Sequence, residues 1–158
     1  MTTAPQDNPF QPPAAALQDG LGVATGEPLY RLAAAGIATF FGTPVAGSWV
    51  IAQNLKRLNR PQEVQKAWRV GIGITVLIFV LSWFLPDNFP AAPINIAAVF
   101  AMHQYAKQNT GEALDRHAAA GGGYLSNWRA FGISLLFLIV IMAIVFGAAF
   151  LLPLTGNA

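Results

Sequence analysis

Long apolar runs without charged residues constrain this chain more than any other feature. The strongest run extends from Ala130 to Leu152 and contains the sequence ISLLFLIVIMAIVFGAAFLL. A helix needs about 20 predominantly apolar residues to cross the roughly 30 Å hydrocarbon core of a bilayer, so this run is typical of a transmembrane helix. Charged residues make up only 10% of the chain and apolar residues 54%, whereas soluble domains carry about 25% charged residues. We therefore expect an all-α membrane protein.

Three further apolar segments precede this run, and together they predict four transmembrane helices in one helical domain over 29–154. The expected spans are 32–52, 67–85, 90–106 and 129–153. The second can begin further back, at Pro61, because proline suits the first position of a helix. The third is short, since Pro90 and Pro93 at its head and His103 at its foot leave about 14 apolar residues. A re-entrant or interfacial placement of this third segment stays open.

The distribution of Lys and Arg predicts the orientation of these spans. Four crossings place eight cations on one side and Arg31 alone on the other, whereas three crossings split them five to four. The positive-inside rule therefore favours four crossings, with both termini outside and both basic loops in the cytoplasm. The first basic loop is expected to contact anionic lipid headgroups and to fix orientation through five cations: Lys56, Arg57, Arg60, Lys66 and Arg69.

The remaining composition narrows the classes of protein. Residues 1–28 hold five of the eleven prolines and no Lys or Arg, which predicts a disordered tail without a cleavable signal peptide. Cysteine is absent, so disulfides and cysteine-ligated metals are excluded. The few cations lie beside the apolar runs, which favours a membrane surface over nucleic acid as their partner. Three glycines at 121–123 should end a short helix in the second basic loop.

Small residues are concentrated in the first apolar segment. Two rows spaced at i,i+4 would lie on one side of a continuous helix, and small residues let a neighbouring backbone approach closely in lipid. Pro44 adds a kink, because it removes a backbone hydrogen bond and crowds the carbonyl of Phe40. We predict a helix-packing motif formed by Thr39, Gly42, Thr43, Pro44, Ala46 and Gly47. The alternative is that Gly42–Ser48 lines a path for a substrate or an ion.

Two segments of the chain carry a pattern of residues: ATFFGTPVAGSWVIAQNLKRLNRPQEVQKAW and, downstream, GGGYLSNWRAFGI. It consists of Thr-Phe-x-Gly-x-Pro-x-Ala-Gly, then Asn and a basic pair, and later Gly-Gly followed by Ser-x-Trp. In this pattern the chain resembles a family of small, uncharacterised bacterial inner-membrane proteins. The resemblance implies the architecture and a bacterial inner-membrane location, but no activity. The matching positions are Thr39, Phe40, Gly42, Pro44, Ala46, Gly47, Asn54, Lys56, Arg57, Gly122, Gly123, Ser126 and Trp128.

Residues capable of chemistry are sparse. No charged side chain or histidine lies within the apolar core of a predicted span, which disfavours a pump or an ion-coupled transporter. One cluster on the predicted cytoplasmic side could act chemically, formed by His103 at the end of the third span and by Glu112, Asp115 and His117 of the second basic loop. The spacing of its histidines fits no standard zinc pattern. We therefore predict no catalytic residue, no cofactor and no metal site.

Three functional hypotheses follow from these features. The leading one is an interaction or scaffold protein that forms a homo-oligomer or joins another membrane protein in a complex. The second is a small channel or facilitative transporter, acting as an oligomer, with a polar path lined by Thr39, Thr43, Ser48 and Asn95. The third is a membrane enzyme that uses the loop cluster.

Overall fold

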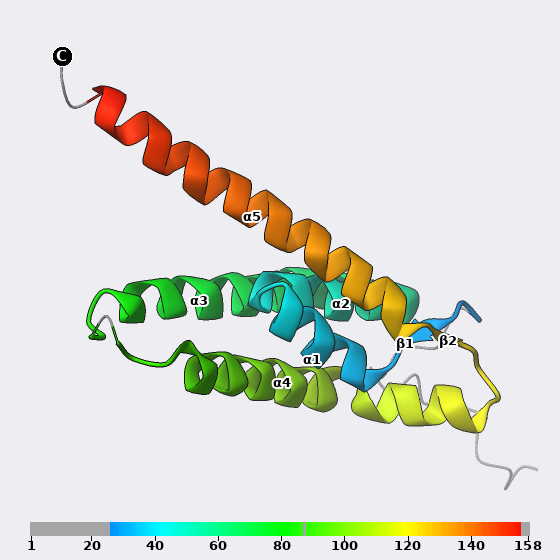
Figure 1. Cartoon of the computed structure of the whole chain (residues 1–158). Coiled ribbons are helices and arrows are strands. Elements are labelled where there is room, and N and C mark those ends of the chain that lie inside the picture. The colour runs from blue at the N-terminus through cyan, green and yellow to red at the C-terminus, as the bar shows by residue number, and fades with distance from the viewer. Residues whose placement is uncertain (1–25, 87, 156–158) are drawn as a thin grey trace, which may run out of the picture.

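The fold is a bundle of helices arranged around a helical hairpin. The structure is a computed structural model and describes residues 26–86 and 88–155. Figure 1 shows α1 and α2 in the middle of the bundle, α3 and α4 beside them, and α5 leaving at an angle. The all-α prediction is confirmed; most of the predicted disordered tail, residues 1–25, lies outside the described residues. The elements in order are β1 (Leu29–Tyr30), α1 (Leu32–Phe41), α2 (Pro44–Arg57), the 3-10 helix η1 (Pro61–Glu63), α3 (Val64–Ser82), α4 (Ala91–Ala119), β2 (Tyr124–Leu125) and α5 (Asn127–Thr155).

The first apolar segment, 32–52, is broken in the middle. Helix α1 ends at Phe41 and helix α2 begins at Pro44. Proline has no N–H to donate to a preceding turn and pushes the residue before it out of the helical conformation. Thr43 is accordingly extended, with φ −176° and ψ 172°. The prediction of one kinked transmembrane helix over 32–52 is therefore wrong, because α1 and α2 have 10 and 14 residues where a crossing needs about 20.

Helices α1 and α2 fold back on each other as a hairpin. The side-chain amide of Asn54, near the end of α2, bonds both backbone groups of Tyr30, just before α1. Its Oδ1 accepts from the Tyr30 N–H at 2.8 Å, and its Nδ2 donates to the Tyr30 carbonyl at 2.8 Å. Strand β1 also pairs in parallel with β2 at this place. The chain therefore leaves one end of the bundle through α1 and returns to the same end through α2.

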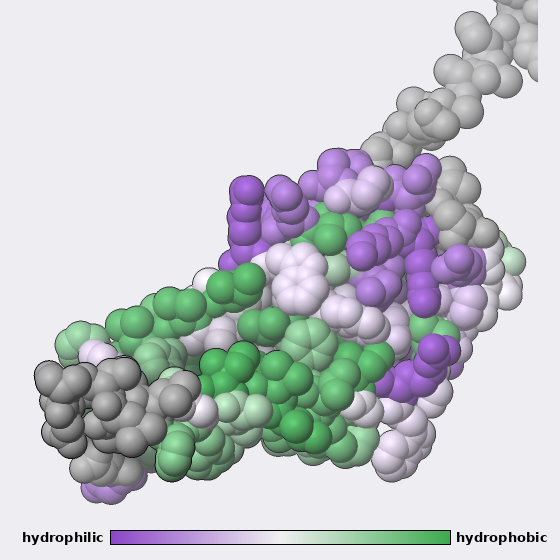
Figure 2. Space-filling model, turned by 90° about the horizontal axis from the view of Figure 1, so that it is seen from above, coloured by the Kyte–Doolittle hydropathy of each residue, from purple (hydrophilic) through white to green (hydrophobic). Residues whose placement is uncertain are grey.

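We call the end of the bundle that contains the β1–β2 pair the basic end. All nine Lys and Arg come from segments that meet there: the start of α1, the end of α2, η1 with the first two turns of α3, the second half of α4, and the start of α5. Figure 2 shows hydrophilic residues over this end and hydrophobic residues over the opposite one. Because the hairpin returns to its starting end, Arg31 lies with the other eight cations and not opposite them.

Away from the basic end, large apolar side chains are exposed. Two helices of the described chain are long and apolar enough to cross a membrane, Pro61–Ser82 and Asn127–Phe150. They coincide with the predicted spans 67–85 and 129–153. The predicted span 90–106 is the first half of α4, which does not meet the same test. Helix α4 continues without a break through the short helix expected in the second loop, and ends before Gly121, whose φ of 74° favours glycine.

Candidate functional site

The small residues of the first segment lie at helix contacts inside the chain. A Cβ added to Gly47 would overlap Thr39 Oγ1 of α1 and lie 3.1 Å from the Ala35 carbonyl. A Cβ at Gly42 would lie 2.7 Å from the Cβ of Ala46 and 3.0 Å from that of Ser134 in α5. Only glycine allows these approaches without displacement of a neighbour. The surface expected to face another helix therefore faces the second half of the same segment and α5.

The polar groups predicted to line a path are largely bonded to backbone. The Thr39 hydroxyl donates to the Ala35 carbonyl, and the Ser48 hydroxyl to the Val45 carbonyl, both at 2.8 Å. The Asn95 side chain of α4 donates to the carbonyl of Phe40 at 3.5 Å. Thr43 differs, since its Oγ1 is buried without a hydrogen-bond partner in the described part of the chain. The first two bonds each lie within one helix and the third joins α4 to α1, and they leave little polar surface for a passing solute.

The five cations predicted to contact anionic lipid gather at the basic end but are not equivalent. Arg60 pairs with Glu63 at 2.6 Å and donates to the Asn109 carbonyl of α4, also at 2.6 Å. Arg57 donates to the Pro28 carbonyl and lies 5.6 Å from the centre of the Tyr30 ring. These two side chains therefore brace the bundle. The other three are exposed at its surface: Lys56, Lys66 and Arg69.

The loop cluster considered for chemistry is divided between different surroundings. His117 is buried, its Nε2 lies 2.9 Å from the Gly123 carbonyl, and its ring occupies space that a side chain at Gly122 would need. Glu112 pairs with Arg116 at 2.8 Å on the exposed face of α4. Across the described residues, no group of three or more His, Asp or Glu side chains is placed to hold a metal ion. His117 thus fixes the glycine turn after α4.

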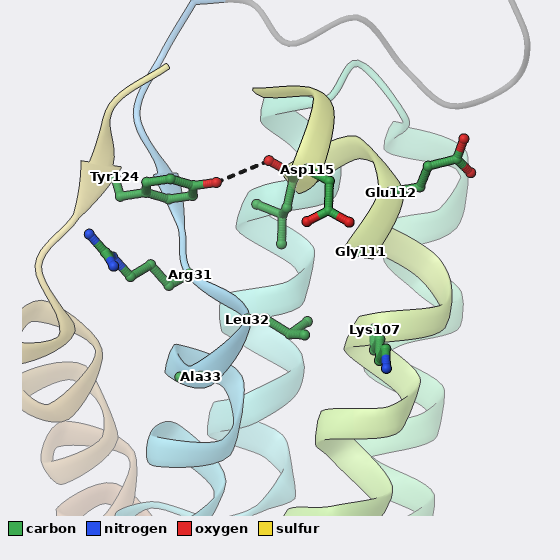
Figure 3. A pocket seen from close by; sticks show the side chains of 9 residues that line it. Arg31, Leu32, Ala33, Lys107, Gly111, Glu112, Asp115 and Tyr124 are labelled. Carbon is green, nitrogen blue, oxygen red and sulfur yellow. Dashed lines mark hydrogen bonds between the residues drawn. The ribbon is translucent and has the colours of Figure 1, made fainter. Parts of the chain in front are cut away.

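A cavity of about 510 Å³ opens at the basic end between α1, α4 and β2. We call it the charged cavity, because two basic and two acidic residues line it: Arg31, Lys107, Glu112 and Asp115. Figure 3 shows Arg31 beside the Tyr124 ring, from whose centre its guanidinium carbon lies 5.1 Å. The Tyr124 hydroxyl donates to the Leu114 carbonyl at 3.0 Å, which fixes the ring against α4.

An apolar groove of about 420 Å³ continues from the charged cavity, and we call it the α1–α4 groove. Ala33 lines both spaces. The other residues of the groove are Gly36, Ile37, Phe40, Phe41, Val99 and His103. A second apolar hollow of about 380 Å³ shares Ile37 and Phe41 with this groove and lies between α1 and α5, where Asn127, Trp128 and Phe131 also line it. The charged cavity and the α1–α4 groove together are therefore amphipathic, with a polar mouth and an apolar interior.

The sequence did not predict this arrangement. Four crossings would place Arg31 on the side of the membrane opposite Lys107 and Asp115. These three residues could then not line one cavity. The distribution of Lys and Arg does contain a signal for the hairpin. A hairpin at 32–52 places all nine cations on one side, which satisfies the positive-inside rule more fully than a crossing that leaves Arg31 opposite the other eight.

No known protein family, curated protein or solved structure matches this chain. The resemblance to small bacterial inner-membrane proteins, carried by the segment from Thr39 to Gly47, therefore stays a prediction.

Proposed function

We propose that this protein is a multi-pass membrane protein that works as an interaction subunit, with α5 as the helix that binds a partner. The observation that carries the proposal is the divergence of α5 from the bundle, visible in Figure 1. The first turns of α5 pack inside the chain, where Ala130 and Ser134 are fully buried and the Phe131 ring lies 4.9 Å from that of Phe41. From Leu138 to Phe150 its large side chains are exposed, except that of Ile141, which is half-buried.

The exposed part of α5 has the features of a surface for helix association. Ala143 and Gly147 are spaced at i,i+4, the small-residue spacing that lets two transmembrane helices approach closely. A Cβ added to Gly147 would meet nothing within 4 Å, so this surface is not used by the described chain. In the first segment, by contrast, the small residues are already occupied by the hairpin. The leading hypothesis of an interaction subunit is therefore kept, but its contact surface moves from the first segment to α5.

Photo-crosslinking in cells tests this assignment. A photoreactive amino acid at Ile144, 64% exposed, is compared with one at Phe79 of α3, 60% exposed. We expect a protein adduct from position 144 and only lipid adducts from position 79. Gly147→Leu should abolish the protein adduct while leaving the fold intact, because the added side chain meets open space. Equal adducts at both positions, or no protein adduct at 144, would rule out α5 as the binding helix.

The membrane placement proposed here has three crossings and one re-entrant hairpin. Helices α3 and α5 are the two apolar enough to cross. Helix α4 must return through the same layer, because the link between α3 and α4 lies at the end opposite the basic end (Figure 1). The α1–α2 hairpin enters and leaves at one surface. The non-helical backbone between α1 and α2 can lie within the membrane because other parts of the protein cover it. Gly42 faces Ser134 of α5, and the Pro44 carbonyl faces Gly71 of α3.

Charge supports the orientation of this placement. With three crossings and the hairpin, all nine Lys and Arg lie on one side, which the positive-inside rule assigns to the cytoplasm of a bacterial cell. The described residues before α1, 26–31, then lie in the cytoplasm, and α5 ends outside. This proposal replaces the expectation that both termini lie outside, which depended on a crossing at 32–52.

A further inference from the structure

We propose that the charged cavity and the α1–α4 groove together bind one molecule of phosphatidylethanolamine. This inference rests on the proposed membrane location. The charged cavity lies at the basic end, where headgroups of the cytoplasmic leaflet would be, and the groove leads from it along α1 toward the apolar part of the bundle. The headgroup would occupy the cavity, and one acyl chain would occupy the groove.

The charges of the cavity fit a headgroup that carries both signs. Two basic and two acidic side chains line it, so a phosphate alone would meet repulsion from the carboxylates. Lys107 and Asp115 make no ion pair within the described part of the chain, whereas Glu112 is paired with Arg116. Figure 3 shows Asp115 on the side of α4 that faces Arg31 and Tyr124, with Glu112 pointing away. Arg31 and Lys107 are therefore assigned to the phosphate, and Asp115 to the ammonium group.

This assignment distinguishes between common phospholipids. The primary ammonium of phosphatidylethanolamine can donate hydrogen bonds to the Asp115 carboxylate, and such charge-assisted bonds are the strong ones. Phosphatidylcholine has a quaternary ammonium and no N–H to donate. Phosphatidylglycerol has a phosphate but no cation, so it leaves Asp115 without a partner beside a second negative charge. The cavity should therefore prefer the ethanolamine headgroup to both.

The groove explains why the ligand should be a lipid. Ala33 joins it to the cavity, and Gly36 keeps it open, since a Cβ there would lie 3.6 Å from Val99 Cγ1, which lines the groove as well. The surrounding bilayer is as apolar as the groove, so an acyl chain gains little by entering it. The groove orients the lipid, and the preference between lipids comes from the headgroup.

The test uses the whole chain in vesicles of equal parts phosphatidylethanolamine, phosphatidylcholine and phosphatidylglycerol. The protein is extracted in mild detergent, and the retained lipids are quantified by native mass spectrometry. We expect phosphatidylethanolamine to be enriched roughly tenfold over each of the others, which corresponds to ~1.4 kcal/mol. Asp115→Asn and Lys107→Gln should each bring the enrichment close to parity. Lys66→Gln, also exposed at the basic end but outside the cavity, should leave it unchanged.

Each contrary result has a distinct meaning. Equal retention of the three lipids, or full enrichment in Asp115→Asn, would overturn the site while leaving the membrane location standing. Displacement of the retained lipid by free phosphoethanolamine as readily as by added phosphatidylethanolamine would show that the acyl chain adds nothing and would overturn the role of the groove. Failure of the chain to enter vesicles would refute the membrane location itself, and the lipid site with it.

Discussion

Replacing Gly47 by alanine tests the close approach of α1 and α2. The added Cβ would overlap Thr39 Oγ1 and lie 3.1 Å from the Ala35 carbonyl. Thr39 cannot move freely, because it is 1% exposed and its hydroxyl donates to that same carbonyl at 2.8 Å. Overpacking of this kind costs about 1–3 kcal/mol, and the higher helix propensity of alanine returns about 0.5–1 kcal/mol. With the middle of each range, the expected net loss of stability is about 1.3 kcal/mol.

Thermal unfolding in detergent, followed by circular dichroism, measures this loss. At roughly 2–4 °C per kcal/mol for a chain of this size, Tm should fall by about 3–5 °C. Gly73→Ala in α3 is the control, because its Cβ meets nothing within 4 Å, and it should raise Tm slightly. Thr39→Ala removes the overlapping hydroxyl, so it should recover part of the loss when combined with Gly47→Ala. A Gly47→Ala variant as stable as Gly73→Ala would refute the hairpin contact.

Three further substitutions probe the contacts around the hairpin by the same unfolding measurement. Asn54→Leu leaves the buried N–H and carbonyl of Tyr30 without partners, at about 1–3 kcal/mol for each group; no loss would contradict the closure of the hairpin. Gly71→Ala places a Cβ 2.7 Å from the Pro44 carbonyl and should destabilise, so behaviour like Gly73→Ala would contradict the packing of α2 on α3. Arg60→Gln breaks the bonds to Glu63 and to the Asn109 carbonyl and should cost about 1–3 kcal/mol, whereas Arg116→Gln, whose ion pair is exposed, should cost well under 1 kcal/mol.

The sequence predicted the helices whose signal is local. The run from Ala130 to Leu152 could be little other than one long apolar helix, and the start at Pro61 follows from the preference of proline for a first turn. The glycines at 121–123 end α4 because Gly121 adopts a positive φ. Each of these features depends on neighbouring residues, so each could be predicted without knowledge of the rest of the fold.

The hairpin could not be predicted in the same way. A kinked crossing and a hairpin have the same composition over 32–52, and Pro44 is compatible with either a kink or a chain reversal. The two differ in contacts between residues far apart in the sequence, such as that of Asn54 with Tyr30, 24 positions apart, and these leave no local pattern in the sequence. The charged cavity depends on that reversal, because only the hairpin brings Arg31 to the end of the bundle that holds Lys107 and Asp115.

The orientation of the chain tests the central claim most directly, namely that the first apolar segment is a hairpin and not a crossing. The chain has no native cysteine, so single cysteines can replace Glu27, Gln62, Asn88 and Thr155. An impermeant thiol reagent is applied to cells whose outer membrane has been permeabilised. We predict that positions 88 and 155 react before lysis and that positions 27 and 62 react only after it. Reaction of position 27 from outside, with position 62 still protected, would place a crossing between them and contradict the hairpin.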